Sequence, residues 1–206
     1  MEFHMEFSYE GIKALDVPDG CRLCIIEPNK VPRPTLSEQD LITDCLARPI
    51  GTKRLREEVF GCRRVLILAD DYTRLTPAHL ILPAIIDELA AGGFAEHEIK
   101  VLVASGTHRA MTSAEKLRKY GKAVLERVEV LDHVAHDESC LTNVGATAKG
   151  TEISINSLVL EADYVIGVGH IVPHRVAGFS GGAKIVQPGV CGEVTTGQTH
   201  WLSAKG

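Results

Sequence analysis

The sequence has no apolar run long enough to cross a membrane as a helix, which takes about 20 consecutive apolar residues. It also lacks the basic and apolar start of a signal peptide, because residues 1–10 include acidic side chains. Positive charge is scarce as well, and the net charge of −5 argues against a nucleic acid partner. We therefore expect a cytoplasmic protein with neither a membrane nor a nucleic acid as its partner.

The cysteines lack the clustering of a disulfide framework or a zinc site. Only Cys21 and Cys24 have the spacing of a metal or redox pair. A strand is predicted over residues 21–27, and positions three apart in a strand face opposite ways. We therefore interpret all six as structural, reduced thiols: Cys21, Cys24, Cys45, Cys62, Cys140 and Cys191.

The chain length of 206 residues suits one domain with a small appendage, and an apolar content of 45% is ordinary for a globular protein. We expect residues 1–50 to form a lead-in that packs on a main domain of residues 51–206. The lead-in pattern predicts strands near residues 5–9 and 21–27, a proline-rich linker over 28–34 and a helix over 37–47 that Ser37 and Asp40 begin.

The main domain alternates apolar runs with helical segments. Strands are predicted over residues 64–69, 100–104, 128–131 and 164–168. Helices are predicted over 76–91 with Thr76 as the cap, from Thr112 with Glu115 as a capping box, and over 156–161. This alternation predicts an α/β fold with a mostly parallel sheet flanked by helices, preceded by the small β-containing lead-in.

Polar clusters follow three of the predicted strands. They are Asp71 with Arg74, Thr107 with His108, and His170 with His174. The carboxyl ends of parallel strands share one edge of the sheet, where ligands bind, so we expect these clusters to converge.

A glycine-rich segment, residues 174–184, ends in Lys184. Glycines allow the backbone to approach a ligand closely. A phosphate-binding loop does not fit, because it needs Gly-Lys followed by Ser or Thr, and here Ala183 and Ile185 flank the lysine. Lys184 is therefore either a covalent anchor for a substrate or cofactor, or a surface lysine after a turn.

Other interpretations remain open for the arginine and the histidines. Arg74 suits a carboxylate or phosphate, but it could instead pair with Asp70 or Asp71. The set His108, His170, His174 and His200 could serve a zinc hydrolase. Against that, Pro173 interrupts a helix, and no glutamate follows His170 as in zinc proteases.

Four motifs together resemble the nickel-dependent lactate racemase family. They are Asp71-Tyr-Thr-Arg74, Gly106-Thr-His-Arg109, His174 with the segment from Gly178 to Lys184, and His200-Trp201. They stand in the family's order and extend over nearly the whole chain. Each motif alone is weak, whereas the set is specific.

The resemblance implies a nickel pincer nucleotide, a pyridinium-3-thioamide-5-thiocarboxylic acid mononucleotide that is attached to the lysine matching Lys184. It implies His200 as a nickel ligand, His108 and His174 as the acid–base pair, and Arg74 as the substrate-carboxylate ligand. We also expect cofactor contacts from Asp71, Thr73, Gly181 and Gly182. The implied reaction is racemisation or epimerisation at C2 of a 2-hydroxy acid, by hydride transfer to the pyridinium.

The resemblance also implies partners that build the cofactor, and a second domain that this sequence lacks and that completes the site in family members. The rival interpretation is a non-catalytic module that binds a nucleotide or a carboxylate.

Overall fold

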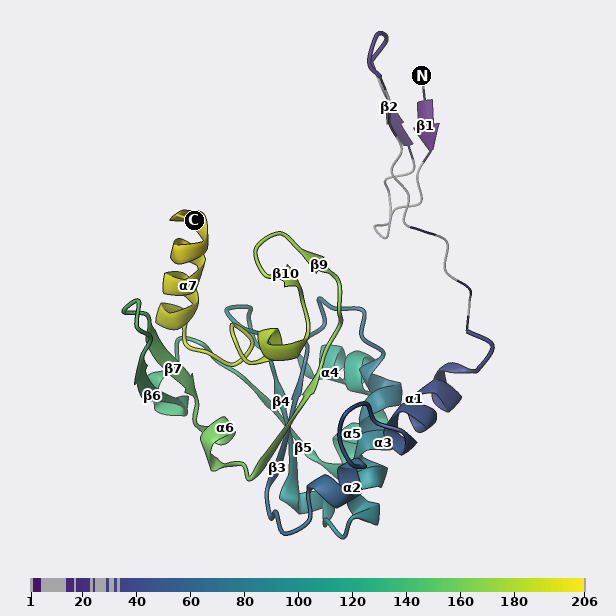
Figure 1. The fold of residues 1–206 in the computed structure, drawn as a ribbon, viewed down its shortest axis with the longest axis vertical. Helices are drawn as coiled ribbons and strands as arrows, with labels where there is room; N and C mark the ends of the chain where they lie inside the picture. Colours follow the sequence, from purple (N-terminus) through teal and green to yellow (C-terminus); the bar gives the residue numbers. More distant parts are fainter. Residues whose placement is uncertain are drawn as a thin grey trace. The chain divides into compact units, whose positions relative to one another are not determined.

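The computed structural model describes residues 2–4, 14–16, 18–22, 24, 29, 32 and 34–205 (Figure 1). Its contacts divide the chain into two compact units, residues 1–35 and 36–206. In the first unit β1 (Glu2–His4) pairs antiparallel with β2 (Ala14–Asp16). The strand expected over residues 5–9 lies outside the described residues. Of the strand expected over 21–27, the described residues Cys21, Arg22 and Cys24 belong to no strand.

The second unit begins with α1 (Glu38–Ala47), whose predicted cap is confirmed because Ser37 Oγ accepts from the Asp40 N–H at 3.1 Å. This helix contacts α3 (Ala78–Ala91), one of the helices that cover the main sheet. The expected lead-in of residues 1–50 therefore extends over both units. Its separation from a cofactor-bearing domain of residues 51–206 stays a prediction.

The centre of the second unit is a parallel sheet in the order β5-β4-β3-β8. All four strands were expected: β3 (Val65–Ala69), β4 (Ile99–Val103), β5 (Glu129–Asp132) and β8 (Tyr164–Val168). β3 is buried along its whole length, as its continuous apolar sequence predicts for a strand covered on both faces. The α/β fold with a mostly parallel sheet is confirmed.

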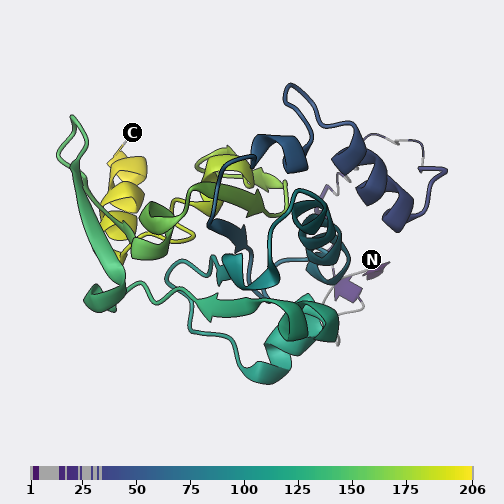
Figure 2. The ribbon, with the colours of Figure 1, turned by 90° about the horizontal axis from the view of Figure 1, so that it is seen from below.

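Helices cover one face of this sheet (Figure 2). Alternate strand residues such as Ile67 and Val101 pack against Leu82 and Ile86 of one helix and Tyr120 of another. The helices after α1 are α2 (Leu55–Glu58), α3 (Ala78–Ala91), α4 (Ser113–Tyr120) and α5 (Lys122–Arg127), and the short 3-10 helix η1 (Glu96–Glu98) precedes β4.

Two helix starts test the capping predictions. The Thr112–Glu115 capping box of α4 is confirmed. The prediction that Thr76 caps α3 is wrong, because its hydroxyl donates to Asp70 Oδ2 and the helix begins after Pro77. The carboxylate of Asp70 is buried, so this bond satisfies its Oδ2 where water cannot.

The other face of the sheet is covered by an antiparallel hairpin that the sequence did not reveal. Leu66, Leu68 and Leu102 pack with Ile155 of this hairpin layer and with Val190, which lies just before the last helix. The layer contains η2 (Glu138–Cys140), β6 (Leu141–Ala146), β7 (Glu152–Asn156) and α6 (Ser157–Glu161).

The last segment closes over the carboxyl ends of the strands (Figure 1). It comprises a small hairpin of β9 (Pro173–His174) and β10 (Gly178–Phe179), the 3-10 helix η3 (Gly182–Ile185) and α7 (Glu193–Lys205). β4 and β8 lie on opposite sides of β3, so the order of strands reverses there, and ligands of open α/β sheets bind at such a point. Within the described residues no helix is long and apolar enough to cross a membrane.

Candidate functional site

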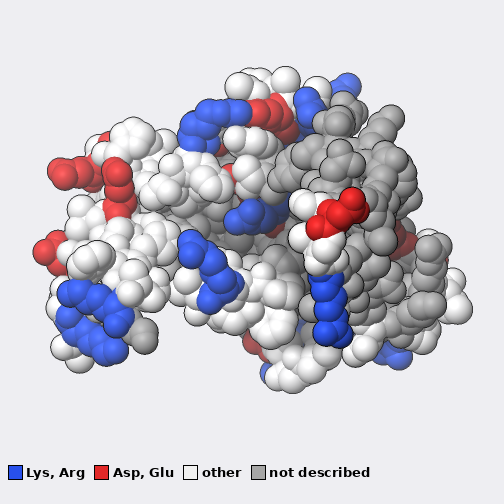
Figure 3. All heavy atoms as spheres, turned by 90° about the horizontal axis from the view of Figure 1, so that it is seen from above, with Lys and Arg blue, Asp and Glu red and all other residues white. Residues whose placement is uncertain are grey.

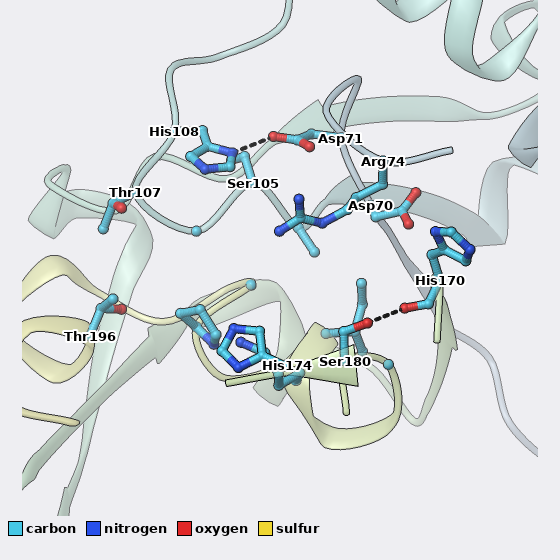
Figure 4. A pocket seen from close by; sticks show the side chains of 18 of the residues that line it. Asp70, Asp71, Arg74, Ser105, Thr107, His108, His170, His174, Ser180 and Thr196 are labelled. Atoms are coloured by element: carbon cyan, nitrogen blue, oxygen red, sulfur yellow. Dashed lines mark hydrogen bonds and ion pairs between the residues drawn. The ribbon is translucent and has the colours of Figure 1, made fainter. Parts of the chain in front are cut away.

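A cavity of about 230 Å³ lies where the strand order reverses (Figure 4). Its walls come from the residues after β3, β4 and β8, from the glycine-rich segment and from α7. The residues that line it include Asp70, Asp71, Arg74, His108, His170, His174, Ser180, Gly181, Lys184, Thr196 and His200. The three polar clusters expected to converge therefore do converge.

Asp71 holds His108 in one tautomer. Asp71 Oδ2 lies 2.7 Å from Nδ1 of His108, and Oδ1 accepts from the backbone N–H and hydroxyl of Thr73 at 3.0 and 2.5 Å. The Asp71 side chain is buried and the His108 ring is half exposed. A carboxylate facing Nδ1 makes that nitrogen the donor, so Nε2 of the neutral His108 ring carries a lone pair.

His174 is held in the opposite tautomer. Its Nδ1 accepts from the backbone N–H groups of Val176 and Ala177, both at 3.2 Å. A nitrogen that accepts two hydrogen bonds carries no proton, so the proton lies on Nε2. Desolvation lowers the pKa of His174, and the positive charges of Lys184 and nearby basic groups lower it further. Figure 4 shows the two histidines across the pocket from each other, with Arg74 between them in that view.

Arg74 and Lys184 are the cations of the pocket without a carboxylate partner among the described residues. The alternative that Arg74 pairs with Asp70 or Asp71 is wrong. Asp70 instead lies 2.9 Å from Nζ of Lys119, and Asp71 faces His108. Figure 3 views the molecule from this end and shows Lys and Arg atoms beside a hollow. The pocket is therefore suited to an anion.

The glycine-rich segment needs its glycines for the turn before Lys184. Gly181 has φ +80°, and a Cβ on it would lie 2.8 Å from Ile171 Cγ1. Ser180 fixes this turn to the end of β8, because its hydroxyl donates to the His170 carbonyl at 2.6 Å and accepts from the Val172 N–H at 2.9 Å. Lys184 then lies in η3, at the wall of the pocket.

Two expected residues do not line the cavity. Thr73 supports Asp71 through the two hydrogen bonds above. Gly182 lies instead at an apolar hollow beside β8, with Val165 and Ile185. No three His, Cys, Asp or Glu side chains in the described part of the chain are grouped as metal ligands, so the four histidines that line the pocket form no such set.

The sequence did not reveal the buried residues that hold the pocket residues in place. Lys119 on α4 is buried, and its ammonium donates to the carbonyl oxygens of Arg74 and Thr76 at 2.7 and 3.1 Å. The capping box of α4 predicted where this helix begins. The sequence could not show that Lys119, near the end of the helix, faces Asp70.

His133 is the second missed residue, and it links the hairpin layer to the start of α7. It is fully buried, its Nε2 lies 2.9 Å from the Cys191 carbonyl oxygen, and its Nδ1 lies 3.3 Å from Nδ2 of Asn156. The Glu193 N–H also donates to the Ala135 carbonyl at 2.9 Å. These contacts place the helix that carries His200.

We expect the free energy of unfolding to fall as the pH drops below about 6.5, because burial lowers the pKa of His133 in the folded protein. A lowered pKa means that the unfolded chain binds the proton first, so this stability is present above pH 6.5 and lost below it. The His133→Gln variant should show a pH slope smaller by up to about 1.4 kcal/mol per pH unit in urea denaturation.

The control for this experiment is His97→Gln, at an exposed histidine outside the pocket, which should keep the wild-type slope. His174 contributes a slope of the same sign in both proteins. Equal slopes for the His133 variant and the control would contradict the prediction.

The protein is therefore an α/β protein whose parallel sheet carries, at the carboxyl ends of its strands, a pocket that is lined by histidines and suited to an anion. The chain belongs to the Lactate racemase N-terminal domain family, which matches residues 9–205.

Curated relatives support this membership. The chain is 36% identical over 165 residues to lactate racemase of Lactiplantibacillus plantarum, a match that covers 80% of this chain and 39% of that protein. It is 35% identical over 155 residues to lactate racemase of Thermoanaerobacterium thermosaccharolyticum, covering 75% and 36%. The chain thus spans about two fifths of the length of these relatives.

Solved structures support the same family membership. The lactate racemase apoprotein from Thermoanaerobacterium thermosaccharolyticum aligns with a TM-score of 0.75 at 33% identity, over 93% of this chain and 43% of that one. A crystal structure of a protein from Thermotoga maritima aligns with a TM-score of 0.68 at 28% identity, over 81% and 41%.

Proposed function

We propose that this chain is the cofactor-bearing part of an isomerase that racemises or epimerises a 2-hydroxy acid at C2, with lactate as the simplest substrate. The observation that carries the proposal is the pair of histidines in one pocket, held in opposite tautomers. Family membership supports the same reaction. The proposal includes a cytoplasmic location and partners that build the cofactor.

The pocket fits the nickel pincer nucleotide by the chemistry of its groups. His200 offers an imidazole suited to nickel, and Lys184 offers a primary amine for the covalent bond. The positive charge that Lys184 carries before its amine is bonded would attract the phosphate of an incoming mononucleotide, and Arg74 stays available for the substrate carboxylate. When bound, the cofactor would supply the acceptor for the α-hydrogen, which no side chain in the pocket could remove as a proton at a useful rate.

Arg74 would hold the substrate carboxylate, since its guanidinium is free to make a bidentate contact. His108, with its lone pair on Nε2, is ready to accept the hydroxyl proton of one enantiomer. His174 offers its Nε2–H as a hydrogen-bond donor in this structure, so it would serve as the base for the other enantiomer only after that proton moves to Nδ1 and the two backbone hydrogen bonds to Nδ1 break. The buried carboxylate of Asp71 would stabilise the imidazolium that forms on His108.

Intact mass tests this proposal. The chain expressed together with the cofactor-building enzymes should gain the mass of one pincer nucleotide and bind about one nickel ion, because Lys184 provides a single attachment point. Lys184→Ala should gain no mass. Lys149→Ala is the control, since this lysine lies away from the pocket, and it should gain the adduct in full.

An unmodified wild-type chain would refute the enzyme assignment. If that unmodified chain bound mononucleotides or carboxylates, it would be the non-catalytic module. If it instead retained zinc through its histidines, it would be the zinc hydrolase.

A further inference from the structure

Two residues of the pocket have a buried side-chain atom without a hydrogen-bond partner among the described residues, Asp70 and Thr196. Asp70 Oδ1 has the Lys119 ammonium 2.9 Å away as its ion-pair partner, whereas Thr196 has none. Thr196 on α7 is 3% exposed, and its Oγ1 has no hydrogen-bond partner among the described residues. The residue forms part of the wall of the cavity. Buried hydroxyls are almost always bonded, so one left alone beside a ligand pocket calls for a partner.

The neighbouring threonines of α7 show that the helix otherwise satisfies its hydroxyls. Thr195 is equally buried, and its Oγ1 donates to the Glu152 carbonyl and accepts from the Ser154 N–H, both at 2.9 Å. Thr199 Oγ1 donates to the Thr196 carbonyl at 2.9 Å and accepts from Gln187 Nε2 at 2.8 Å. Of these three threonines, Thr196 alone lines the pocket.

The surroundings decide what the partner is. Thr196 precedes His200 by four residues, so both lie on the same face of α7 and both line the pocket. The same pocket contains the free charges of Arg74 and Lys184, whereas its carboxylates Asp70 and Asp71 are already paired. An occupant that these charges attract carries anionic oxygens, to which a hydroxyl donates.

We propose that Thr196 is a further binding residue of this site, whose hydroxyl donates a hydrogen bond to an anionic oxygen of the mononucleotide. Figure 4 places Thr196 at the end of the pocket remote from Asp70 and His170. Threonine in a helix occupies two rotamers, so a rotation about χ1 turns Oγ1 towards an occupant. The identity of the occupant rests on the proposed function, whereas the unsatisfied hydroxyl does not.

The first measurement is the thermal stability of the unloaded chain. Thr196→Val keeps the shape and removes a hydroxyl that has no partner, so the melting temperature should rise by about 2–4 °C. Thr195→Val is the matched control at the same burial on the same helix, and it should lower the melting temperature because it breaks two hydrogen bonds. A fall for Thr196→Val equal to that of the control would overturn the proposal, since Thr196 would then be structural.

The second measurement is calorimetric binding of nicotinic acid mononucleotide, a pyridinium mononucleotide without the sulfur arms, to the unloaded chain. Thr196→Val should weaken binding by about tenfold, and Thr196→Ser should bind as wild type does. Unchanged binding in Thr196→Val, or no binding to the wild-type chain, would overturn the assignment of this ligand to Thr196. The racemase proposal fails separately, through the absence of the adduct on Lys184.

Discussion

If the proposed racemase function holds, His108→Ala and His174→Ala in a cofactor-loaded, active preparation should each stop racemisation in both directions, while each should spare the oxidation of a different enantiomer. Full racemisation needs one histidine to remove the hydroxyl proton and the other to return it. The first half of the reaction needs only one of them. General acid–base catalysis typically contributes about a hundred- to ten-thousand-fold, so the loss for the affected enantiomer should be of that size.

The measurement is single-turnover formation of the 2-oxo acid from each pure enantiomer, stopped by rapid quenching. We expect His108→Ala to oxidise the enantiomer that His174 serves, and His174→Ala to oxidise the opposite one. His97→Ala changes an exposed histidine away from the pocket and should leave both enantiomers unaffected. If both pocket variants lost the same enantiomer, or neither lost any, the two-base mechanism would be wrong.

Lys119→Met should destabilise the fold by about 3–5 kcal/mol, because it leaves the carboxylate of Asp70 buried without its cation. Both side chains of this pair are less than a tenth exposed. The change also removes the donor to the Arg74 carbonyl, so the loop that carries Arg74 and Asp71 should loosen. Weaker binding of substrate carboxylate should accompany the loss of stability.

Chemical denaturation measures this effect, and two further variants make it specific. Lys122→Met removes an exposed lysine that pairs with Glu126 on the surface, and it should change stability by less than about 0.5 kcal/mol. Adding Asp70→Asn to Lys119→Met should recover part of the loss, since the buried negative charge is gone. A Lys119 variant no less stable than the Lys122 variant would contradict the importance of the pair.

The sequence was informative where one residue type has one physical role. A continuous apolar run predicted β3, because a strand covered on both faces needs no polar alternation. Shorter segments rich in apolar residues predicted the other three strands of the sheet. Polar residues directly after those strands predicted the position of the pocket. The roles of its residues remain predictions, because chemistry depends on ligands as well as on placement.

The sequence was uninformative where a role depends on a distant partner. Thr76 has the residue type of a cap, yet its hydroxyl bonds Asp70, which lies earlier in the chain and becomes its neighbour only in the fold. The hairpin of β6 and β7 has no strict alternation, because the register shifts between Asn143 and Gly145. Nothing in the sequence distinguishes Thr196 from Thr195, since only the packed helix decides which hydroxyl is bonded.

The position of β3 in the sheet has a consequence during synthesis of the chain. One side of β3 pairs with β4, which follows soon after it, but the other side waits for β8, almost a hundred residues later. Until Tyr164–Val168 emerge from the ribosome, this fully apolar strand exposes an open edge, which is a template for pairing with other chains. Lys184 and His200 emerge later still, so the pocket cannot accept a cofactor before the sheet is closed. The proposed attachment at Lys184 would therefore be a late event that acts on a folded chain, and a chain that stops before residue 164 should be prone to aggregate.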